Sequence, residues 1–570
     1  MKNFFPINYR VDATNTIQHY FHVKCQFTSK QKETILRMPN WTPGSYMIRE
    51  YSRFLHGFKT ENSWSQTDLA EWTVLGEGQI EIEYLIYAFE DLTVRTNYLD
   101  SEFGLITPAA LFLQVITDED IKISIEWKLP QNRQVYSPLK NKNDDLSNFV
   151  TDYDLLYDSP FFITDQEPIS LNTENCTHEI LIQSDIEDSL KKKLCDDLKV
   201  IVEFQAKILG GYPNEYYLFI LIFTEGGYGG LEHNACSVNI FDASKLKDRN
   251  EYLKLLELLC HEYFHLWNVK RIRPKALGPF DYSKPNLTKE LWIAEGITSF
   301  YDAYFLLQAG FLTIEEYLAK IYQDINLLED NSGEEWMSLE ESSFTAWTKY
   351  YKRTSDSHNT GISYYTKGGV LVLCMQIRII AETNGKKSFI DIMKKLYQDF
   401  YLKQNRGFTK QEFFQIASEV TGLNLLDEFN IYLTQNVRIP VLEYLAKLGI
   451  SPKLENPINE LGFTCRESNR GLFVNKIFHK RIDPLAEIYL ADEILAIDDF
   501  RITSNSQMQS VLDTKKENSY IKILIARKSK LKNVNLKLGI SYKDRSLVFT
   551  DKESKEVNPY WDLFHKVHSR

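Results

Sequence analysis

The hydrophobic pattern of this chain changes twice along its length, and these changes constrain its fold more than any other feature. Through about residue 165, apolar and polar side chains alternate, as they do in strands with one buried face. Turn-forming clusters at Trp41-Thr-Pro-Gly-Ser and Asn141-Lys-Asn-Asp-Asp separate the alternating stretches. An all-β N-terminal part is therefore predicted, with alternation at Ile17, His19, Phe21, Val23, Cys25 and Phe27, at Ile80, Ile82, Tyr84 and Ile86, and at Ile121, Ile123, Ile125 and Trp127.

The middle of the chain has a mainly helical pattern, and strands return near the C-terminus. From Arg249 to about residue 445 the apolar spacing is that of helices, and Asn286-Leu287-Thr288 is a predicted start for a helix that runs through Leu307. Tyr216–Phe223 is nearly all apolar, which indicates a strand buried on both faces. The predicted fold class is multidomain α+β. Its other predicted elements are a strand at Glu179–Ile182, a helix at Glu187–Leu209, and strands at Gly471–Ile477, Glu493–Ile497 and Tyr520–Ala526.

Size and composition limit the class of protein. A chain of 570 residues is too long for one hydrophobic core, so about three or four domains are expected. The net charge of -12 argues against nucleic acid or anionic membranes as partners. No apolar run approaches the ~20 residues that span a bilayer, and the N-terminus does not resemble a signal peptide. The seven cysteines are scattered, which favours reduced thiols and a cytoplasmic location.

The sequence His261-Glu262-Tyr263-Phe264-His265 is an H-E-x-x-H motif. On a helix, residues four apart share a face, so both imidazoles can bind one ion while Glu262 lies beside it. Zinc suits two imidazoles, and a catalytic zinc site keeps one position open for water. That water becomes more acidic, and a neighbouring carboxylate can accept its proton. The alternative is a coincidental match on an amphipathic helix, and a third ligand decides between the two.

Glu295, in Trp292-Ile-Ala-Glu-Gly, is the candidate third ligand. It follows His265 on the next predicted helix and completes the set of two histidines and one glutamate found in hydrolytic zinc sites. Its turn is otherwise apolar, and a buried carboxylate without a partner is costly, so a cation is expected beside it. Asp302, further along the same face, either orients a ligand or faces the solvent.

At these residues the chain resembles the gluzincin metallopeptidases, whose second helix carries W-x-x-E-G. The closer resemblance is to the glycyl aminopeptidase family, which carries a PDZ domain. Together the matching motifs span most of the chain and are specific as a set. They are His261-EYFHLWNVKRIRPKALGPFDY, the following LWIAEGITSFYDAY, Trp41-TPGSYMIREYSR, Gly227-YGGLEHNACS and Ile362-SYYTKGG.

The resemblance implies a domain organisation and an activity. The expected domains are an N-terminal β-domain over residues 1–168, a thermolysin-like zinc peptidase domain over 169–448, a PDZ-like domain over 449–545, and a C-terminal tail over 546–570. The expected activity removes single residues, often Gly or Ala, from the N-termini of peptide substrates, with one zinc ion per chain.

Gly230-Leu-Glu232-His233 occupies the place of the G-x-M-E-N exopeptidase motif of related aminopeptidases, with Leu and His replacing Met and Asn. The resemblance implies that Glu232 binds the α-ammonium group of the substrate by a charge-assisted hydrogen bond. The glycines from Gly226 let the backbone lie close to a ligand, which adds Gly229 and Gly230 to the expected substrate site. His233 is expected to contact the substrate or the outer shell of the zinc, or to be structural. A surface position at a strand end is the alternative for Glu232.

Tyr365, in Tyr-Thr-Lys-Gly, matches the tyrosine that faces the metal in related aminopeptidases, which implies a phenol that stabilises the oxyanion. Tyr364 is adjacent, so the register is open by one residue, and core packing is the alternative for either. Arg49 and Arg53 belong to a matching motif with no assigned role, and structural anchoring is expected for them.

Leu461-Gly-Phe463 and Leu490-Ala-Asp-Glu-Ile-Leu-Ala-Ile-Asp498 are similar to a PDZ domain. Such domains add a peptide as an extra strand and hold its C-terminal carboxylate on loop N–H groups. Ala491 stands where a glycine is usual. The alternative to capture of a peptide C-terminus is therefore a module that packs beside the active site.

These features predict hydrolysis without a covalent intermediate, with Glu262 as general base, Tyr365 at the oxyanion and Glu232 at the amino end of the substrate. Three other functions compete with this prediction. A zinc endopeptidase would not need Glu232. A PDZ protein that binds peptides with little catalysis is opposed by the intact ligands and Glu262. An epoxide hydrolase is an activity that a related gluzincin hosts.

Overall fold

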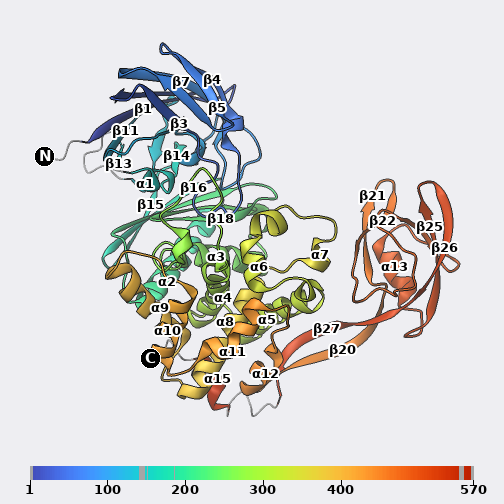
Figure 1. Ribbon diagram of the computed structural model, residues 1–570. Coiled ribbons are helices and arrows are strands. Elements are labelled where there is room, and N and C mark those ends of the chain that lie inside the picture. Colours follow the sequence, from blue (N-terminus) through green and yellow to red (C-terminus); the bar gives the residue numbers. More distant parts are fainter. Residues whose placement is uncertain (1–3, 140–147, 151, 185, 551–557, 566–570) are drawn as a thin grey trace. The chain divides into compact units, whose positions relative to one another are not determined.

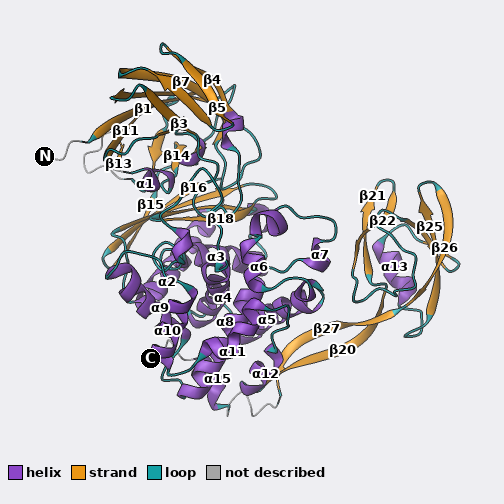
Figure 2. Ribbon diagram, in the orientation of Figure 1, coloured by secondary structure: helices purple, strands orange, loops and turns teal. Residues whose placement is uncertain are grey.

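The computed structural model describes residues 4–139, 148–150, 152–184, 186–550 and 558–565 (Figure 1). The predicted turn that begins at Asn141 lies outside the described residues. The chain forms two compact units. Figure 2 shows that its first and last parts consist mainly of strands and its middle mainly of helices, which confirms the predicted multidomain α+β class. The first unit comprises Met1–Thr288, Tyr304–Phe311 and Met393–Lys410. The second unit comprises Lys289–Ala303, Leu312–Ile392 and Gln411–Arg570.

Three sheets make up the N-terminal part. The first has the order β13-β11-β1-β2-β7-β4, the second β10-β3-β6-β5 and the third β12-β14-β9-β8. A short helix, α1 (Tyr153–Tyr157), accompanies them. The strands are β1 (Phe5–Asn15), β2 (Tyr20–Ser29), β3 (Glu33–Arg37), β4 (Leu55–Thr60), β5 (Trp64–Asp68), β6 (Glu71–Leu75), β7 (Gly78–Tyr87), β8 (Tyr98–Leu99), β9 (Gly104–Ile106), β10 (Gln114–Val115), β11 (Ile121–Lys128), β12 (Gln134–Tyr136), β13 (Asn148–Val150) and β14 (Phe161–Thr164).

The alternation of side chains explains most of these strands, since every second residue faces the core. Ile80, Ile82, Tyr84 and Ile86 of β7 are all buried, and the predicted strand is confirmed. The prediction for β2 began too early. Ile17 is 90% exposed in the turn before β2, because the β1–β2 connection has already left the core at that point.

A five-stranded sheet with the order β15-β16-β17-β19-β18 follows. Its central strand, β17 (Tyr216–Phe223), is parallel to both neighbours and almost wholly buried, as predicted. The edge strand β18 (Tyr228–His233) runs antiparallel to β19 (Cys236–Phe241). Helix α3 (Arg249–Phe264) packs against both β18 and β19. The remaining elements are β15 (Ile169–Thr173), β16 (Cys176–Gln183) and α2 (Asp188–Leu209).

After α3, the next helix begins with a π-helical turn, Trp292–Gly296, that continues into α4 (Ile297–Gln308). The predicted start near Asn286 is wrong. The Asn286 amide instead donates to the Asp281 carbonyl at 2.8 Å, so it closes the preceding turn and does not cap the helix. The later helices are α5 (Ile314–Glu329), α6 (Leu339–Phe344), α7 (Ser357–Thr360), α8 (Thr366–Thr383), α9 (Phe389–Leu396), α10 (Lys410–Thr421), α11 (Leu425–Thr434), α12 (Val441–Lys447) and α15 (Pro559–His565).

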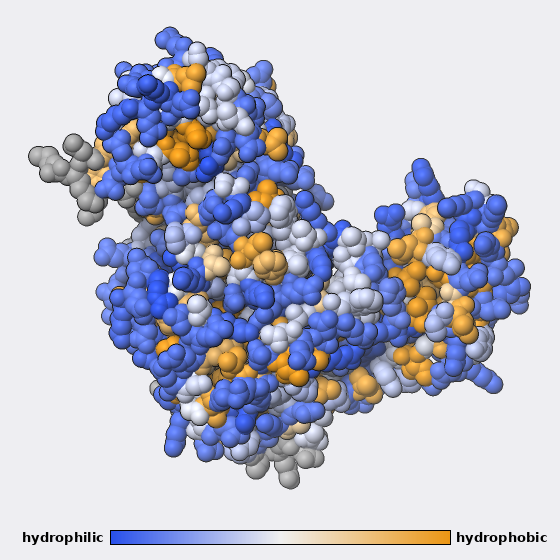
Figure 3. All heavy atoms as spheres, viewed as in Figure 1, coloured by the Kyte–Doolittle hydropathy of each residue, from blue (hydrophilic) through white to orange (hydrophobic). Residues whose placement is uncertain are grey.

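The C-terminal strands form a sheet with the order β21-β22-β23-β25-β26, in which β24 also pairs with β23. Its core includes Leu472, Ile497 and Ile523. Figure 3 shows apolar residues on the surface of this part, and Leu485 and Leu531 are among its exposed side chains. The predicted strands are confirmed in β22 (Gly471–Ile477), β23 (Glu493–Ile497) and β25 (Tyr520–Arg527). The other elements are β20 (Ile450–Glu460), which pairs with β27 (Gly539–Phe549), β21 (Phe463–Ser468), β24 (Phe500–Arg501), α13 (Asn505–Leu512) and β26 (Lys530–Lys537).

All seven cysteines carry free thiols, as the sequence predicts. Among the described residues, no helix combines the length and the apolar character needed to cross a membrane.

Candidate active site

The last turn of α3 carries His261, and His265 is the C-cap residue that follows its end. Asp248 caps the N-terminus of α3 by accepting hydrogen bonds from two backbone N–H groups. The rings of His261 and His265 lie 4.7 Å apart between centroids, as expected for residues one turn apart. His265 Nδ1 lies 2.6 Å from the Asn268 carbonyl oxygen. A carbonyl can only accept, so Nδ1 carries the proton and Nε2 keeps the lone pair that a metal needs.

Glu295 lies in the π-helical turn, and only 3% of its surface is exposed. Its position is set by a close backbone contact with the Tyr-Thr-Lys-Gly motif. A Cβ at Gly296 would lie 2.6 Å from the Cα of Gly368, so neither residue has room for a side chain there. The sequence-based expectation of a buried carboxylate at Glu295 is therefore confirmed.

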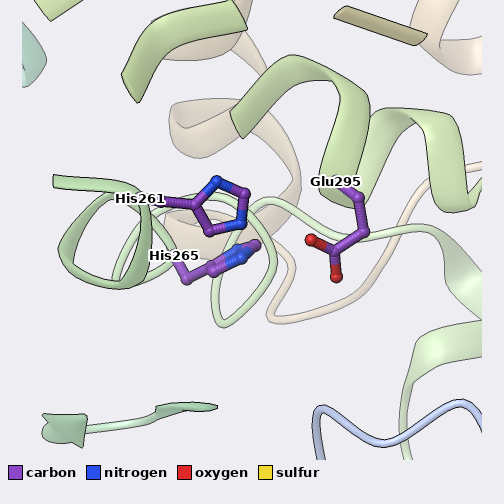
Figure 4. A group of neighbouring side chains, drawn as sticks. All are labelled: His261, His265 and Glu295. Atoms are coloured by element: carbon purple, nitrogen blue, oxygen red, sulfur yellow. The ribbon is translucent and has the colours of Figure 1, made fainter. Parts of the chain in front are cut away.

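His261, His265 and Glu295 form a group that can hold a metal ion, since their ligand atoms lie within 4.8 Å of one another. In Figure 4 the two imidazoles and the carboxylate point toward one another. Two imidazoles and one carboxylate make up the donor set of a catalytic zinc site with an open fourth position. The tautomer imposed on His265 by Asn268 also fits such an ion.

Glu262 is buried beside this group, and its position depends on Gly230. A Cβ at Gly230 would lie 2.1 Å from Glu262 Oε1 and 2.4 Å from its Cδ. The edge strand β18 thus leaves space for the Glu262 carboxylate only because residue 230 has no side chain. The ligand atoms of Glu232, Glu262 and His265 also lie within 4.8 Å of one another.

Glu232 is 4% exposed, so the surface alternative for it is wrong. The loop that begins at Trp41 reaches its carboxylate. Gly44 has a φ of +78°, and a Cβ there would lie 2.8 and 2.9 Å from the two Glu232 oxygens. The loop is fastened by the Trp41 indole N–H, which donates to the Asp281 carbonyl at 3.1 Å, and by stacking of Trp41 on Tyr282. The motif that begins at Trp41 and had no assigned role in the sequence therefore forms a wall beside Glu232.

A cavity of about 300 Å³ opens next to Glu232, lined in part by Trp41, Gly44, Tyr46, Arg273 and Phe280. Sequence reasoning missed this lining, because it combines a loop of the N-terminal sheets with residues that follow the zinc-binding motif. The glycine within the Trp41-Thr-Pro-Gly-Ser cluster is the signal that could have indicated close packing against a partner.

Arg49 and Arg53 both make polar contacts, and structural anchoring by them stays a prediction. Arg49 Nε donates to Ser45 Oγ at 3.0 Å within the same loop. Arg53 pairs with Glu90 at 2.6 Å on the surface.

His233 lies on the face of β18 opposite to Glu232, because successive strand residues alternate. Its Nδ1 is 3.1 Å from Asp158 Oδ1, and Lys270 Nζ is 2.8 Å from the same oxygen. Burial raises the pKa of Asp158, but the charge of Lys270 and the His233 hydrogen bond outweigh burial and leave the pKa below its ordinary value. His233 therefore belongs to a buried polar network, and a direct contact with substrate stays a prediction.

Tyr364 and Tyr365 differ in exposure. Tyr364 is fully buried, and its hydroxyl lies 3.4 Å from that of Tyr351. Burial raises the pKa of Tyr364, and electrostatic interactions with the neighbouring Tyr351 and Glu295 groups add to this effect. Tyr365 is half-buried, and its ring stacks on that of Tyr350.

Asp302 is also buried, which makes its solvent-facing alternative wrong.

Family models match three stretches of the chain. The model of the M61 glycyl aminopeptidase matches residues 254–371, which include the H-E-x-x-H motif and Glu295. The model of the M61 N-terminal domain matches residues 8–165, and a PDZ domain model matches residues 448–538. In its catalytic and N-terminal stretches the chain is thus similar to the M61 glycyl aminopeptidase family. These matches confirm the resemblance carried by the motifs, and they support a hydrolase with aminopeptidase activity.

The chain is also similar to solved structures. The chain is similar to an aminopeptidase N family protein from Idiomarina loihiensis, with 25% identity and a TM-score of 0.89 over 97% of this chain and 99% of that chain. Its likeness to an M1 zinc metallopeptidase from Deinococcus radiodurans covers 77% of this chain and 95% of that chain. With 11% identity and a TM-score of 0.48, it is too distant to bear on function. A comparison with curated proteins finds no match.

Proposed function

We propose that this protein is a zinc aminopeptidase that holds one zinc ion through His261, His265 and Glu295. The observation that carries the proposal is the convergence of these three side chains at the C-terminal end of α3, the helix that also presents Glu262. A zinc ion bound there would polarise the scissile carbonyl and acidify a water molecule. The proton fixed on His265 Nδ1 supports this assignment, because it keeps Nε2 available as a ligand atom.

Glu262 is the proposed general base. It is buried, and its carboxylate fits against the backbone at Gly230. In this role Glu262 accepts a proton from the attacking water and later donates it to the leaving amine. Tyr365, half-buried beside Tyr350, is the proposed donor to the oxyanion.

Glu232 is the proposed binding site for the α-ammonium group of the substrate. Three features support this role, namely its burial, its place in one group with Glu262 and His265, and the wall that Gly44 forms beside it. A buried carboxylate favours a cationic partner, and the free amino terminus of a peptide supplies one. Gly229 and Gly230 are proposed to lie along the bound peptide.

The family resemblance supports a preference for a small N-terminal residue such as Gly or Ala. Capture of a peptide C-terminus by the PDZ-like part stays a prediction, as do the domain boundaries at residues 168, 448 and 545. His233 in the substrate site is likewise a prediction. An endopeptidase is the competing function, because the same metal group would serve it without Glu232.

Glu232→Ala separates the two functions. We expect this change to lower kcat/KM for alanyl anilides, because the α-ammonium group loses its charged partner. The loss of transition-state stabilisation should be about 2–4 kcal/mol. N-acetylated peptides should be poor substrates of the wild type. In the variant, the difference in kcat/KM between free and N-acetylated peptides should be smaller.

Glu225→Ala is the matched control, since Glu225 is exposed in the turn before β18 and should leave these ratios unchanged. Internal cleavage of blocked peptides at the rate of free ones would overturn the proposal in favour of an endopeptidase.

A further inference from the structure

A second cavity, of about 690 Å³, lies in the second compact unit. One side is formed by the segment that contains α7, and the other by the end of β22 and the residues after it. We call it the basic groove. The lining residues that carry the argument are Lys349, Tyr350, Arg353, Lys476 and Arg481.

Hydrogen bonds hold the two sides of the basic groove together. The carbonyl oxygen of Ile477, at the end of β22, lies 2.8 Å from Asn359 Nδ2, which donates to it, and 2.8 Å from His358 Nε2. The Asn359 side-chain oxygen accepts from the backbone N–H of His479 at 3.2 Å. Lys480 Nζ donates to the Asn331 carbonyl at 3.0 Å. The groove is therefore a built feature of this unit.

Cations outnumber acids along the basic groove, although the whole chain has a net charge of -12. The lining includes a single carboxylate among the described residues, Asp330, and Arg481 lies 3.7 Å from it. Lys349 pairs with Glu341 at 2.8 Å. Within the described part of the chain, neither Arg353 nor Lys476 has a carboxylate partner, so two positive charges face this space without compensation.

Arg353 is placed to bind an anion. Its Nε donates to the Tyr350 carbonyl at 3.2 Å, and its guanidinium lies 5.1 Å from the centre of the Tyr350 ring. A guanidinium presents paired donors that match the two oxygens of a carboxylate, which a lysine cannot do.

Tyr350 connects the basic groove to the proposed active site. Its ring stacks on Tyr365 at 5.8 Å between centroids with an interplanar angle of 29°. Tyr365 is the proposed oxyanion donor, and Tyr350, which lines the groove, lies directly against it. A peptide whose first bond is cleaved there extends its remaining residues away from the cleaved bond, and the groove is the adjacent space that can receive them.

We propose that the basic groove binds a carboxylate of the peptide on the C-terminal side of the cleaved bond, either its terminal carboxylate or an acidic side chain, with Arg353 as the principal contact and Lys476 as a second. The proposal rests on the aminopeptidase function proposed above. It identifies the substrates as short peptides that carry a negative charge downstream of the cleaved residue.

The test compares tetraalanine with a free C-terminus, tetraalanine amide, and the same amide with Asp as its last residue. Alanyl anilide, which has no downstream carboxylate, serves as the reference substrate. In the wild type we expect kcat/KM for the free acid to exceed that for the amide roughly tenfold, because a charged hydrogen bond is gained. The Asp-containing amide shows whether an acidic side chain can replace the terminal carboxylate.

Arg353→Gln should reduce the acid-to-amide ratio to about twofold and leave the anilide rate unchanged, and Lys476→Gln should have a smaller effect in the same direction. Lys352→Gln is the matched control. Lys352 is the preceding residue and lies over the Trp347 ring, outside the groove, so its change should leave the ratio intact.

Equal wild-type kcat/KM values for tetraalanine and its amide would overturn the proposal. It would also be overturned if Lys352→Gln lowered the acid-to-amide ratio as much as Arg353→Gln, because that result would indicate only long-range attraction. A failure to hydrolyse alanyl anilide would instead count against the aminopeptidase function. In that case calorimetry of the Glu262→Gln variant with tetraalanine and its amide still tests the groove, because binding does not require turnover. Equal affinity for the two peptides would overturn the groove.

Discussion

The contact between Gly230 and Glu262 allows the proposed base to be displaced without altering it chemically. In Gly230→Ala the new Cβ would lie 2.4 Å from Glu262 Cδ, whereas ordinary carbon contacts begin near about 3.5 Å. The carboxylate must therefore move by about 1 Å. Misplacing a catalytic group by that distance costs about 100-fold in rate, or about 2.7 kcal/mol.

Folding should persist in this variant. Gly230 is not among the described residues with positive φ, so alanine can adopt its backbone conformation. The nearest atoms, which must give way, are Cγ, Cδ and Oε1 of the Glu262 side chain and not backbone atoms. We expect kcat/KM for alanyl anilide to fall by about 100-fold, while the zinc content and the midpoint of thermal unfolding remain close to those of the wild type.

A double-mutant cycle with Glu262→Asp identifies the cause of the loss. In the wild-type background, the shorter aspartate side chain moves the carboxylate away from its catalytic position. In the Gly230→Ala background it also relieves the contact with the new Cβ, so the losses of activity from the two changes should be less than additive. Activity of Gly230→Ala within about twofold of the wild type, with the fold intact, would refute this account of the Glu262 position.

Two further outcomes follow from the described contacts. Glu295→Gln should lower zinc content and activity together, because an amide is a poorer ligand than a carboxylate; full metal content by elemental analysis would count against its role as a ligand. Burial lowers the pKa of His178 to about 4, whereas an unfolded histidine titrates near about 6.5. The unfolded state therefore binds the extra proton as the pH falls from about 6.5 to about 4, and stability is lost over that range, by about 2 kcal/mol at pH 5. Urea unfolding at pH 7 and pH 5 should show this loss in the wild type and not in His178→Phe.

The sequence by itself determined the features that depend on local spacing. His261 and His265 share a helix face because they are one turn apart, and Glu295 is buried because its turn is apolar. The strands β7 and β11 follow from alternation of side chains, and β17 from an unbroken apolar run. In each case the pattern that decides the structure lies within a few residues of the chain.

Only the tertiary structure decided the contacts between residues far apart in sequence. The space that Gly230 leaves for Glu262 and the wall that Gly44 forms at Glu232 depend on how separate elements meet. The start of the helix after Asn286 was mispredicted for the same reason, because its side chain bonds backward to the Asp281 carbonyl. Periodicity reports which face of an element is buried, but it does not report which residue of another element that face contacts. The arrangement of the site around its predicted ligands was therefore fixed by packing.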